Sequence, residues 1–346
     1  MKRIFTLLCV LGVMVSARAQ DIHFSQFYMA PLDLNPALTG VMNCKMRFTA
    51  NFRNQWAAVL KNDAYNTYML SYDQKVAVGR YDYFGFGGTL WGDRAGALDF
   101  GTLQVKLSGS YSKRLGGSRT SAHYMVFGAN AGLTQRSINF QNAQFGTQND
   151  DGRFNGDLAS GEAAPSPNFL YADLSAGLLW FSVLDKRNNF YFGLAGSHLN
   201  EANQSFYNGS IARLYSKYTF HAGAQLGVTR DMYIVPGFVA FFQGPSFQYN
   251  GGTNFRFQLS RGRNGNQTFD VGLWARVSNA IDEEGTTFDA LILQTRFDYD
   301  NFGLGFSYDI NTSPLRQASN ANGSFEFSFI YNICRPERRG VYCPSF

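Results

Sequence analysis

Long hydrophobic runs are the first feature that this 346-residue sequence lacks. Beyond the N-terminal twenty residues, no segment offers the roughly 18 uninterrupted apolar residues that a membrane-spanning helix needs. Charged residues are also few, at 16% of the chain, whereas ordinary soluble domains carry about 25%. The first absence excludes a helical membrane protein, and the second disfavours an ordinary soluble domain.

Motifs for catalysis and metal binding are missing as well. The sequence contains no zinc-protease helix motif, nucleophile elbow, Walker loop or CxxC pair. Its four histidines are not grouped with an activated serine, and His198 is predicted to be a structural hydrogen-bonding residue. Residues 149–157 hold oxygen ligands but lack the EF-hand spacing for calcium. We therefore predict a protein that is not an enzyme and has no cofactor or metal site.

The first nineteen residues have the pattern of a secretory signal peptide. Two basic residues precede an apolar run over residues 4–15, and Ser16-Ala17-Arg18-Ala19 supplies the A-x-A cleavage pattern. The apolar run is too short to span a bilayer. We expect cleavage after Ala19, a mature chain that begins at Gln20, and export from the cytoplasm.

Aromatic residues and glycines are abundant, with 33 Phe, 19 Tyr and 36 Gly. Residues 324–333 show how the aromatics are arranged, because in a strand Phe325, Phe327, Phe329 and Tyr331 share one face and polar residues take most of the other. Alternation of this kind over about 9–11 residues is what a transmembrane β-strand requires. The segment also lies near the C-terminus, where a bacterial barrel places its closing strand.

Similar segments recur through the chain and predict an all-β transmembrane antiparallel barrel of about 14 strands (12–16). The expected strands are 45–56, 64–75, 82–93, 98–113, 120–136, 169–183, 188–199, 215–228, 231–243, 246–260, 267–279, 286–299, 301–311 and 322–333. The expected organisation is a signal peptide (1–19), an N-terminal periplasmic or plug segment (20–44), the barrel (45–333) and a C-terminal periplasmic tail (334–346). The N-terminal segment has no clean periodicity, so it is expected at the periplasmic mouth or inside the lumen.

The connections differ in length and in charge. The longest ones, 137–168, 200–214 and 312–321, follow odd-numbered strands and are expected outside the cell, as is the acidic run 282–284. The short connections that follow even-numbered strands are rich in Lys and Arg. This basic rim either solvates the turns or docks an acidic or lipid-bearing periplasmic partner. The overall charge of +5 is too diffuse to indicate nucleic-acid binding.

Charged residues are also expected inside the barrel. The alternation directs six of them to the lumen of four consecutive strands: Asp270, Arg276, Arg296, Asp298, Asp309 and Glu326. Opposite charges on neighbouring strands can pair. They form either a salt-bridge lattice that braces the lumen or a polar path for a cargo segment.

Three cysteines remain after removal of the signal peptide. Cys334 and Cys343 lie close in sequence and could form a disulfide in an oxidising periplasm, or stay as free thiols. Cys44 is then left over.

Several short motifs are spread along the mature chain. They consist of Phe24, Ser25, Gln26, Phe27 and Tyr28; Asn35, Pro36 and Gly40; Arg53, Asn54, Gln55 and Trp56; Tyr72 and Asp73; His198; and Tyr308 and Asp309, followed by residues 323–326. These motifs resemble those of the PorP/SprF family of type IX secretion system membrane proteins. The N-terminal block is the most specific part, and the resemblance covers nearly the whole mature chain.

The resemblance implies an outer-membrane barrel of the type IX secretion and gliding machinery. Its partners would be the lipid bilayer, together with periplasmic secretion subunits, the C-terminal domain of a cargo adhesin, or both. A general porin or hydrophobic-solute channel is the alternative, since it shares the fold. A soluble lectin-like β-protein is a third, weaker possibility.

Overall fold

The computed structural model describes residues 21–118, 121–140, 143–150, 153–161, 166–207, 209–260, 266–279, 285–334 and 343–344. The predicted signal peptide therefore lies outside the described residues, as does most of the predicted C-terminal tail. Within the described part, no helix is long and apolar enough to cross a membrane.

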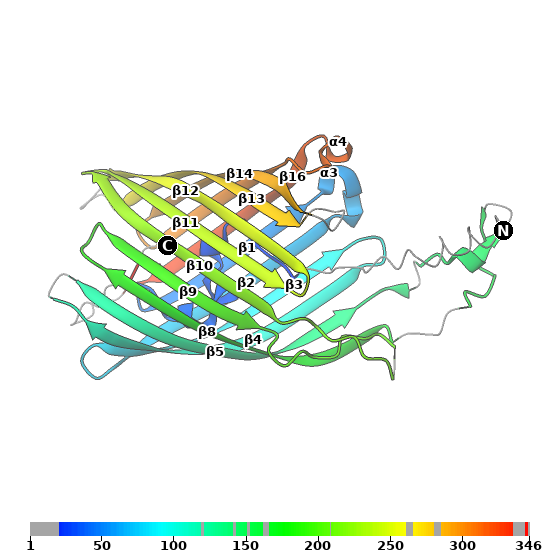
Figure 1. The fold of residues 1–346 in the computed structure, drawn as a ribbon, viewed down its shortest axis with the longest axis horizontal. Coiled ribbons are helices and arrows are strands. Elements are labelled where there is room, and N and C mark those ends of the chain that lie inside the picture. Colours follow the sequence, from blue (N-terminus) through cyan, green and yellow to red (C-terminus); the bar gives the residue numbers. More distant parts are fainter. Residues whose placement is uncertain are drawn as a thin grey trace.

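Fourteen antiparallel strands close into a barrel, as predicted (Figure 1). The barrel strands are β1 (Met46–Gln55), β2 (Tyr65–Val78), β3 (Asp82–Ala95), β4 (Phe100–Gly116), β5 (Ala122–Ser137), β8 (Asn168–Val183), β9 (Asn189–Ser197), β10 (Lys217–Thr229), β11 (Met232–Gln243), β12 (Ser246–Ser260), β13 (Gln267–Asn279), β14 (Thr286–Tyr299), β15 (Phe302–Asn311) and β16 (Asn322–Ile333). Each strand pairs with its sequence neighbour in the barrel, and β1 pairs with β16, from Met46 opposite Ile333 to Gln55 opposite Ser324.

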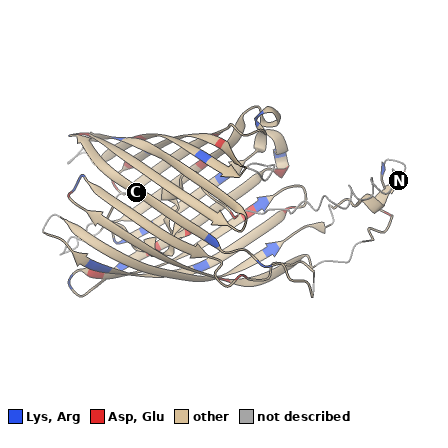
Figure 2. Ribbon diagram, viewed as in Figure 1, with Lys and Arg blue, Asp and Glu red and all other residues tan. Residues whose placement is uncertain are grey.

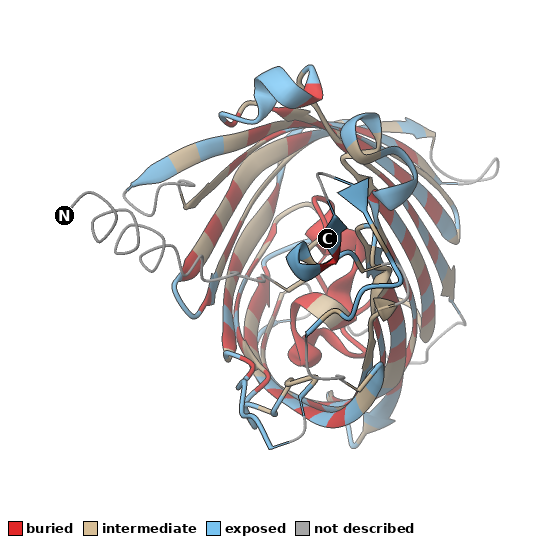
Figure 3. Ribbon diagram, turned by 90° about the vertical axis from the view of Figure 1, so that its right-hand side faces the viewer, coloured by how far each residue is buried: buried red, intermediate tan, exposed pale blue. Residues whose placement is uncertain are grey.

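The predicted alternation appears as alternating burial along the strands (Figure 3). On β16, Phe327 is 53% exposed while its neighbour Glu326 is 0% exposed. Outward aromatic and aliphatic side chains suit contact with lipid, whereas inward polar side chains need partners inside the barrel. Charged residues are correspondingly sparse along the wall (Figure 2).

The two ends of the barrel differ. We call the end that carries residues 138–167, 198–216 and 312–321 the long-loop end, and the opposite end the short-turn end (Figure 1). The long-loop end holds the two-residue strands β6 (Asn149–Asp150) and β7 (Arg153–Phe154) and three short helices, α3 (Ala57–Leu60), η3 (Lys61–Asp63) and α4 (Arg316–Ser319); η5 (Gly146–Gln148) lies in the same loop as β6. The link between β11 and β12 is a tight turn at this end, where Gln243 lies opposite Ser246.

Residues 21–45 lie inside the barrel and are called the N-terminal segment below. Looking into the long-loop end, one sees their buried coils enclosed by the ring of strands (Figure 3). The segment contains three short turns of helix, η1 (Phe27–Met29), α2 (Pro31–Leu34) and η2 (Pro36–Leu38). Seven of its apolar residues, among them Phe27, Met29 and Leu38, belong to one buried cluster with inward-facing wall residues such as Trp274. The lumen therefore has a packed core of its own.

Candidate functional site

The N-terminal segment runs along the lumen from the long-loop end to the short-turn end. Near its start, the Asp21 carboxylate lies 3.4 Å from Lys217 Nζ, at the first residue of β10. Near its finish, Cys44 is disulfide-bonded to Cys334, directly after β16. Between these anchors the segment meets nearly every part of the inner wall.

Ser25 lies at the centre of a buried cluster of charged side chains that joins the N-terminal segment to the wall. The Ser25 amide donates to Glu326 Oε1 at 2.6 Å, and the Gln26 amide donates to Glu326 Oε2 at 2.9 Å. The Ser25 hydroxyl lies 2.9 Å from both carboxylate oxygens of Asp309. Backbone amides of an irregular segment must find acceptors inside the barrel, and Glu326 supplies two of them at once.

Two arginines neutralise these carboxylates. Arg53 forms ion pairs with Glu326 and, at 3.2 Å, with Asp309. Arg276 pairs with Asp309 at 2.8 Å and also donates to the Ser25 hydroxyl. All four charged side chains are buried, and such charges are tolerated only when paired and hydrogen-bonded. Ser25 therefore completes an ion-pair network contributed by four different strands.

The middle of the segment is fixed by Asn35. Its side-chain amide donates to the carbonyls of Leu178 and Leu194, both at 3.1 Å, and lies 3.0 Å from His221 Nε2. The same side chain accepts a hydrogen bond from the Ala37 amide and so caps η2, where Pro36 takes the first helical position. Asn35 thus shapes the segment and binds it to the wall.

Glycines of the inner wall leave room for the segment. A Cβ atom added at Gly177 would lie 2.0 Å from Asn35 Oδ1, and one at Gly128 would lie 2.4 Å from the Ala37 nitrogen. Additions at Gly85 and Gly305 would meet Thr39 and Gln26 at 2.2 and 2.3 Å. The wall and the segment are therefore complementary in shape at four separate places.

A second ion pair holds the segment near the short-turn end. The Gly40 amide donates to Asp73 Oδ2 at 2.7 Å, and Gly40 has φ +72°, a conformation that favours glycine. Arg47 binds both oxygens of the same carboxylate and also donates to the Leu38 carbonyl at 3.1 Å. Asp73 therefore links the barrel wall, through Arg47, to the backbone of the segment.

His198 holds the start of the segment at the long-loop end. It lies directly after β9 and contacts Asp173 through Nδ1 at 2.7 Å and Asp21 through Nε2 at 3.1 Å. Lys106 completes the group at 2.9 Å from Asp173. Burial alone would lower the pKa of His198, but the Asp21 and Asp173 carboxylates raise it above the usual value. Its contacts are those of a structural hydrogen-bonding residue.

The disulfide predicted between Cys334 and Cys343 is wrong, because Cys334 pairs with Cys44 and Cys343 is a free, buried thiol. The reason is the closure of the barrel, which brings the residue before β1 next to the residue after β16. The Cys343 amide donates to Asn43 Oδ1 at 2.8 Å. Burial raises the pKa of the Cys343 thiol, which makes this cysteine a poor nucleophile.

The six charges expected in the lumen fall into three groups. Arg276, Asp309 and Glu326 belong to the Ser25 cluster, Asp270 pairs with Arg256 at 2.9 Å, and Arg296 pairs with Asp298 at 2.9 Å. The partners of three of these carboxylates, Arg256 for Asp270 and Arg53 for Asp309 and Glu326, do not follow from the alternation of residues along the strands. Those pairings depend on the strand register, which periodicity alone does not give.

Other family-motif residues lie away from the N-terminal segment. Asn54 donates to Asn66 at 2.7 Å, Gln55 accepts from Arg53, and the Trp56 ring packs edge-on against Tyr65. Tyr72 and Tyr308 donate to Gln74 and Asn322. These contacts join neighbouring parts of the wall and its long-loop rim. Phe24, in contrast, is buried against Met69 and Trp91 within the lumen.

Several solved structures are similar to this chain at low sequence identity. The CymD monoaromatic hydrocarbon channel has a TM-score of 0.45 and 11% identity, over 89% of this chain and 93% of that one. A Pseudomonas aeruginosa FadL homologue has a TM-score of 0.43 and 11% identity, over 86% and 92%. The Ralstonia pickettii toluene transporter TbuX gives 0.43 and 10%, over 88% and 93%. Among curated proteins, none matches this chain.

The family comparison is more specific. The model of the type IX secretion system membrane protein PorP/SprF matches residues 16–331. This match includes the N-terminal segment and every strand of the barrel except the last residues of β16. The chain belongs to the PorP/SprF family of type IX secretion system membrane proteins.

Proposed function

We propose that this outer-membrane barrel binds periplasmic subunits of the type IX secretion and gliding machinery, and that it thereby supports export or surface anchoring of a cargo adhesin. The observation that carries the proposal is the N-terminal segment packed along the lumen. A lumen filled by the protein's own chain favours a role in binding over a role as a passage. Membership of the PorP/SprF family supports the type IX secretion system as the machinery that contains the binding partner.

The short-turn end is the face that we assign to the periplasm. Bacterial barrels have short periplasmic turns and longer external loops, and the ends of this barrel differ in that way. The disulfide between Cys44 and Cys334 lies at the short-turn end, which suits an oxidising compartment. A periplasmic subunit would therefore meet the turns between β2 and β3, β4 and β5, β8 and β9, and β10 and β11.

These turns are basic. The described Lys and Arg residues of these turns and the adjoining strand ends are Arg80, Lys113, Arg114, Lys186, Arg187 and Arg230, against three aspartates, Asp82, Asp185 and Asp231. Arg80 and Arg114 both lie against the ring of Tyr81, at 5.1 and 4.2 Å from its centroid. Arg119, Arg261, Arg263 and the tail arginines Arg335, Arg338 and Arg339 lie outside the described residues, as does the acidic run 282–284. A basic rim favours an acidic surface on the partner.

Affinity purification of the tagged protein from native membranes tests the proposal. We expect secretion-machinery subunits, or one large adhesin, to co-purify with the wild type. A rim variant, Arg80→Glu with Lys186→Glu, should lose them. Lys61→Glu with Arg316→Glu makes the same charge change at the long-loop end and should retain them. Capture of no secretion component by the wild type, or equal capture by both variants, contradicts the proposal.

A further inference from the structure

The lipid-facing side of the wall carries a groove of about 670 Å³, called the outer groove below, that crosses strands β13, β14, β15, β16, β1 and β2. Two rows of outward side chains form its sides, and the members of each row are direct cross-strand partners. The first row consists of Leu70, Ala50, Phe329, Leu304, Phe297 and Phe269. The second row consists of Tyr68, Phe52, Phe327, Phe306 and Thr295.

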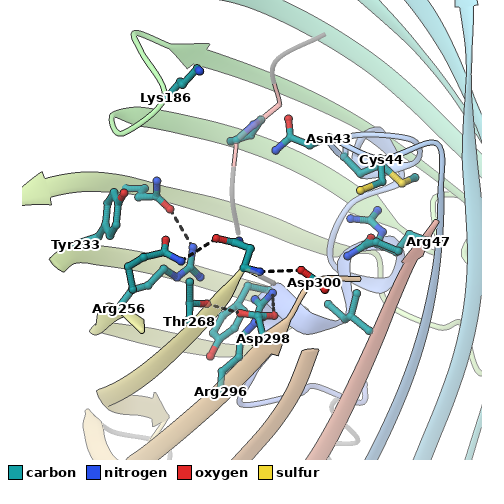
Figure 4. A pocket seen from close by; sticks show the side chains of 18 of the residues that line it. Asn43, Cys44, Arg47, Lys186, Tyr233, Arg256, Thr268, Arg296, Asp298 and Asp300 are labelled. Carbon is teal, nitrogen blue, oxygen red and sulfur yellow. Dashed lines mark hydrogen bonds and ion pairs between the residues drawn. The ribbon is translucent and has the colours of Figure 1, made fainter. Parts of the chain in front are cut away.

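The floor of the outer groove is the backbone of the wall. The floor residues lie between the two rows, so their side chains point into the lumen: Met69, Asn51, Ser328, Gly305 and Arg296. Arg296 shows this arrangement, because its side chain lines a cavity of about 370 Å³ inside the barrel and pairs there with Asp298 at 2.9 Å (Figure 4). The groove outside is therefore bounded by apolar side chains and by backbone.

The outer groove follows an oblique path across the hydrocarbon layer. It begins at Phe269, the third residue of β13 from the short-turn end, and reaches Tyr68, the fourth residue of β2 from the long-loop end. Five gaps between neighbouring strands, each about 4.8 Å wide, make it about 24 Å long. Strands of such barrels tilt by about 35–45°, so the groove covers about half of the roughly 30 Å hydrocarbon core. This is the depth of one leaflet.

Packing distinguishes the outer groove from an open part of the lipid face. Acyl chains are as apolar as the wall, so their association with it depends on van der Waals contact. A chain in the groove touches side chains on two sides and backbone beneath, whereas a chain on an open part of the wall touches protein on one side. The Phe306 and Phe327 rings, 5.1 Å apart, form a continuous part of one side. The volume also lies within the range of ligand pockets, about 300–1,000 Å³.

We infer that the outer groove binds one acyl chain of a phospholipid from the surrounding bilayer. The occupant is a bilayer lipid because the groove is continuous with the lipid-facing surface of the barrel. Since the groove begins near the short-turn end of β13, the headgroup of this lipid lies at that face of the membrane. The bound chain also lies across β1 and β16, the strands that close the barrel.

Native mass spectrometry of the purified full-length protein in a mild nonionic detergent tests the inference. The probe is palmitoyl-oleoyl phosphatidylethanolamine, added at rising concentrations. We expect one lipid per barrel to bind more tightly than any further lipid. Ala50→Phe, which fills the groove, should weaken this first binding by about tenfold, because the loss of roughly ten carbon–carbon contacts is enough for that change. Phe306→Ala with Phe327→Ala, which removes part of one side, should weaken it similarly.

Two matched variants serve as controls. Ala131→Phe places the same new side chain on the exposed lipid face of β5. Phe192→Ala with Phe220→Ala removes another pair of outward rings, 4.9 Å apart, on β9 and β10. Both controls should bind the first lipid as the wild type does, and mobility on unboiled gels shows that each variant is folded.

Three results overturn the inference. The first is a wild type that binds no single lipid more tightly than the following ones. The second is equal weakening by the groove variants and their controls, which would indicate general contact with lipid around the barrel. The third is a first lipid that binds to folded Ala50→Phe as tightly as to the wild type.

Discussion

The backbone amide of Ser25 donates a 2.6 Å hydrogen bond to the carboxylate of Glu326, which lies 301 positions later in the chain. This bond joins the N-terminal segment to the strand that closes the barrel. Arg53, on the other strand of the closing pair, binds the same carboxylate. The Glu326 side chain therefore links the N-terminal segment to both strands of the closing pair.

Replacing Glu326 with Ala is expected to destabilise the folded barrel. The change leaves Arg53 with one buried partner fewer and removes the acceptor of two backbone amides, and breaking a buried pair costs about 3–5 kcal/mol. The temperature at which the folded form is lost on unboiled gels should fall. Arg94→Ala breaks the exposed pair with Asp99 and should leave that temperature almost unchanged. Equal effects from both variants would contradict the role of Glu326.

Replacing Gly177 with Ala should loosen the N-terminal segment. The new Cβ would lie 2.0 Å from Asn35 Oδ1 and 3.2 Å from Pro36 Cδ, and overpacking of this kind costs about 1–3 kcal/mol. Protease cleavage within residues 21–45 of the folded barrel should become faster. Gly116→Ala is the control, since nothing lies within 4 Å of its added Cβ. Unchanged cleavage in Gly177→Ala would show that the segment does not pack here.

Cysteine variants test the disulfide. Cys44→Ser and Cys334→Ser should each remove the same cross-link and abolish the mobility difference between reduced and non-reduced samples. Cys343→Ser should retain that difference, because Cys343 is a free thiol. Loss of a native disulfide typically costs about 2–5 kcal/mol. A mobility difference that disappears in Cys343→Ser but persists in Cys44→Ser would contradict the pairing.

The ion pairs of His198 predict a dependence on pH. Because the folded-state pKa is raised, the contribution of His198 to stability is fully present below its ordinary pKa of about 6.5. It is lost as the pH rises through the raised value. Thermal stability of the wild type should therefore fall from pH 6 to pH 9 more than that of His198→Gln. If the stability of the two proteins changed with pH in parallel, His198 would not be the cause of the pH dependence.

The fourteen strands could be predicted because outward apolar and inward polar residues alternate along each of them. Differences are confined to the ends, as where β2 extends to Val78 by pairing with Asp82 across a tight turn. The position of the N-terminal segment could not be decided in the same way. Residues 21–45 have no periodicity, and the two carboxylates that bind Ser25 lie 284 and 301 positions away in the sequence.

The cysteine pairing depends on the register of the closing strand pair, which the sequence pattern alone does not give. Closeness in sequence favours Cys334 with Cys343, but a closed barrel pairs its first and last strands. Once Met46 lies opposite Ile333, the residues beyond them include Cys44 and Cys334, so the closing register would have predicted this disulfide. The same register would have paired Arg53 with Glu326.

The central claim is that the N-terminal segment keeps the lumen filled and that this barrel serves as a binding component instead of a solute channel. Conductance of the purified full-length protein in planar bilayers tests it most directly. We predict no large, steady open pore for the wild type, and more frequent openings for Gly177→Ala than for Gly116→Ala. A large, steady conductance in the wild type would contradict the claim and favour a porin.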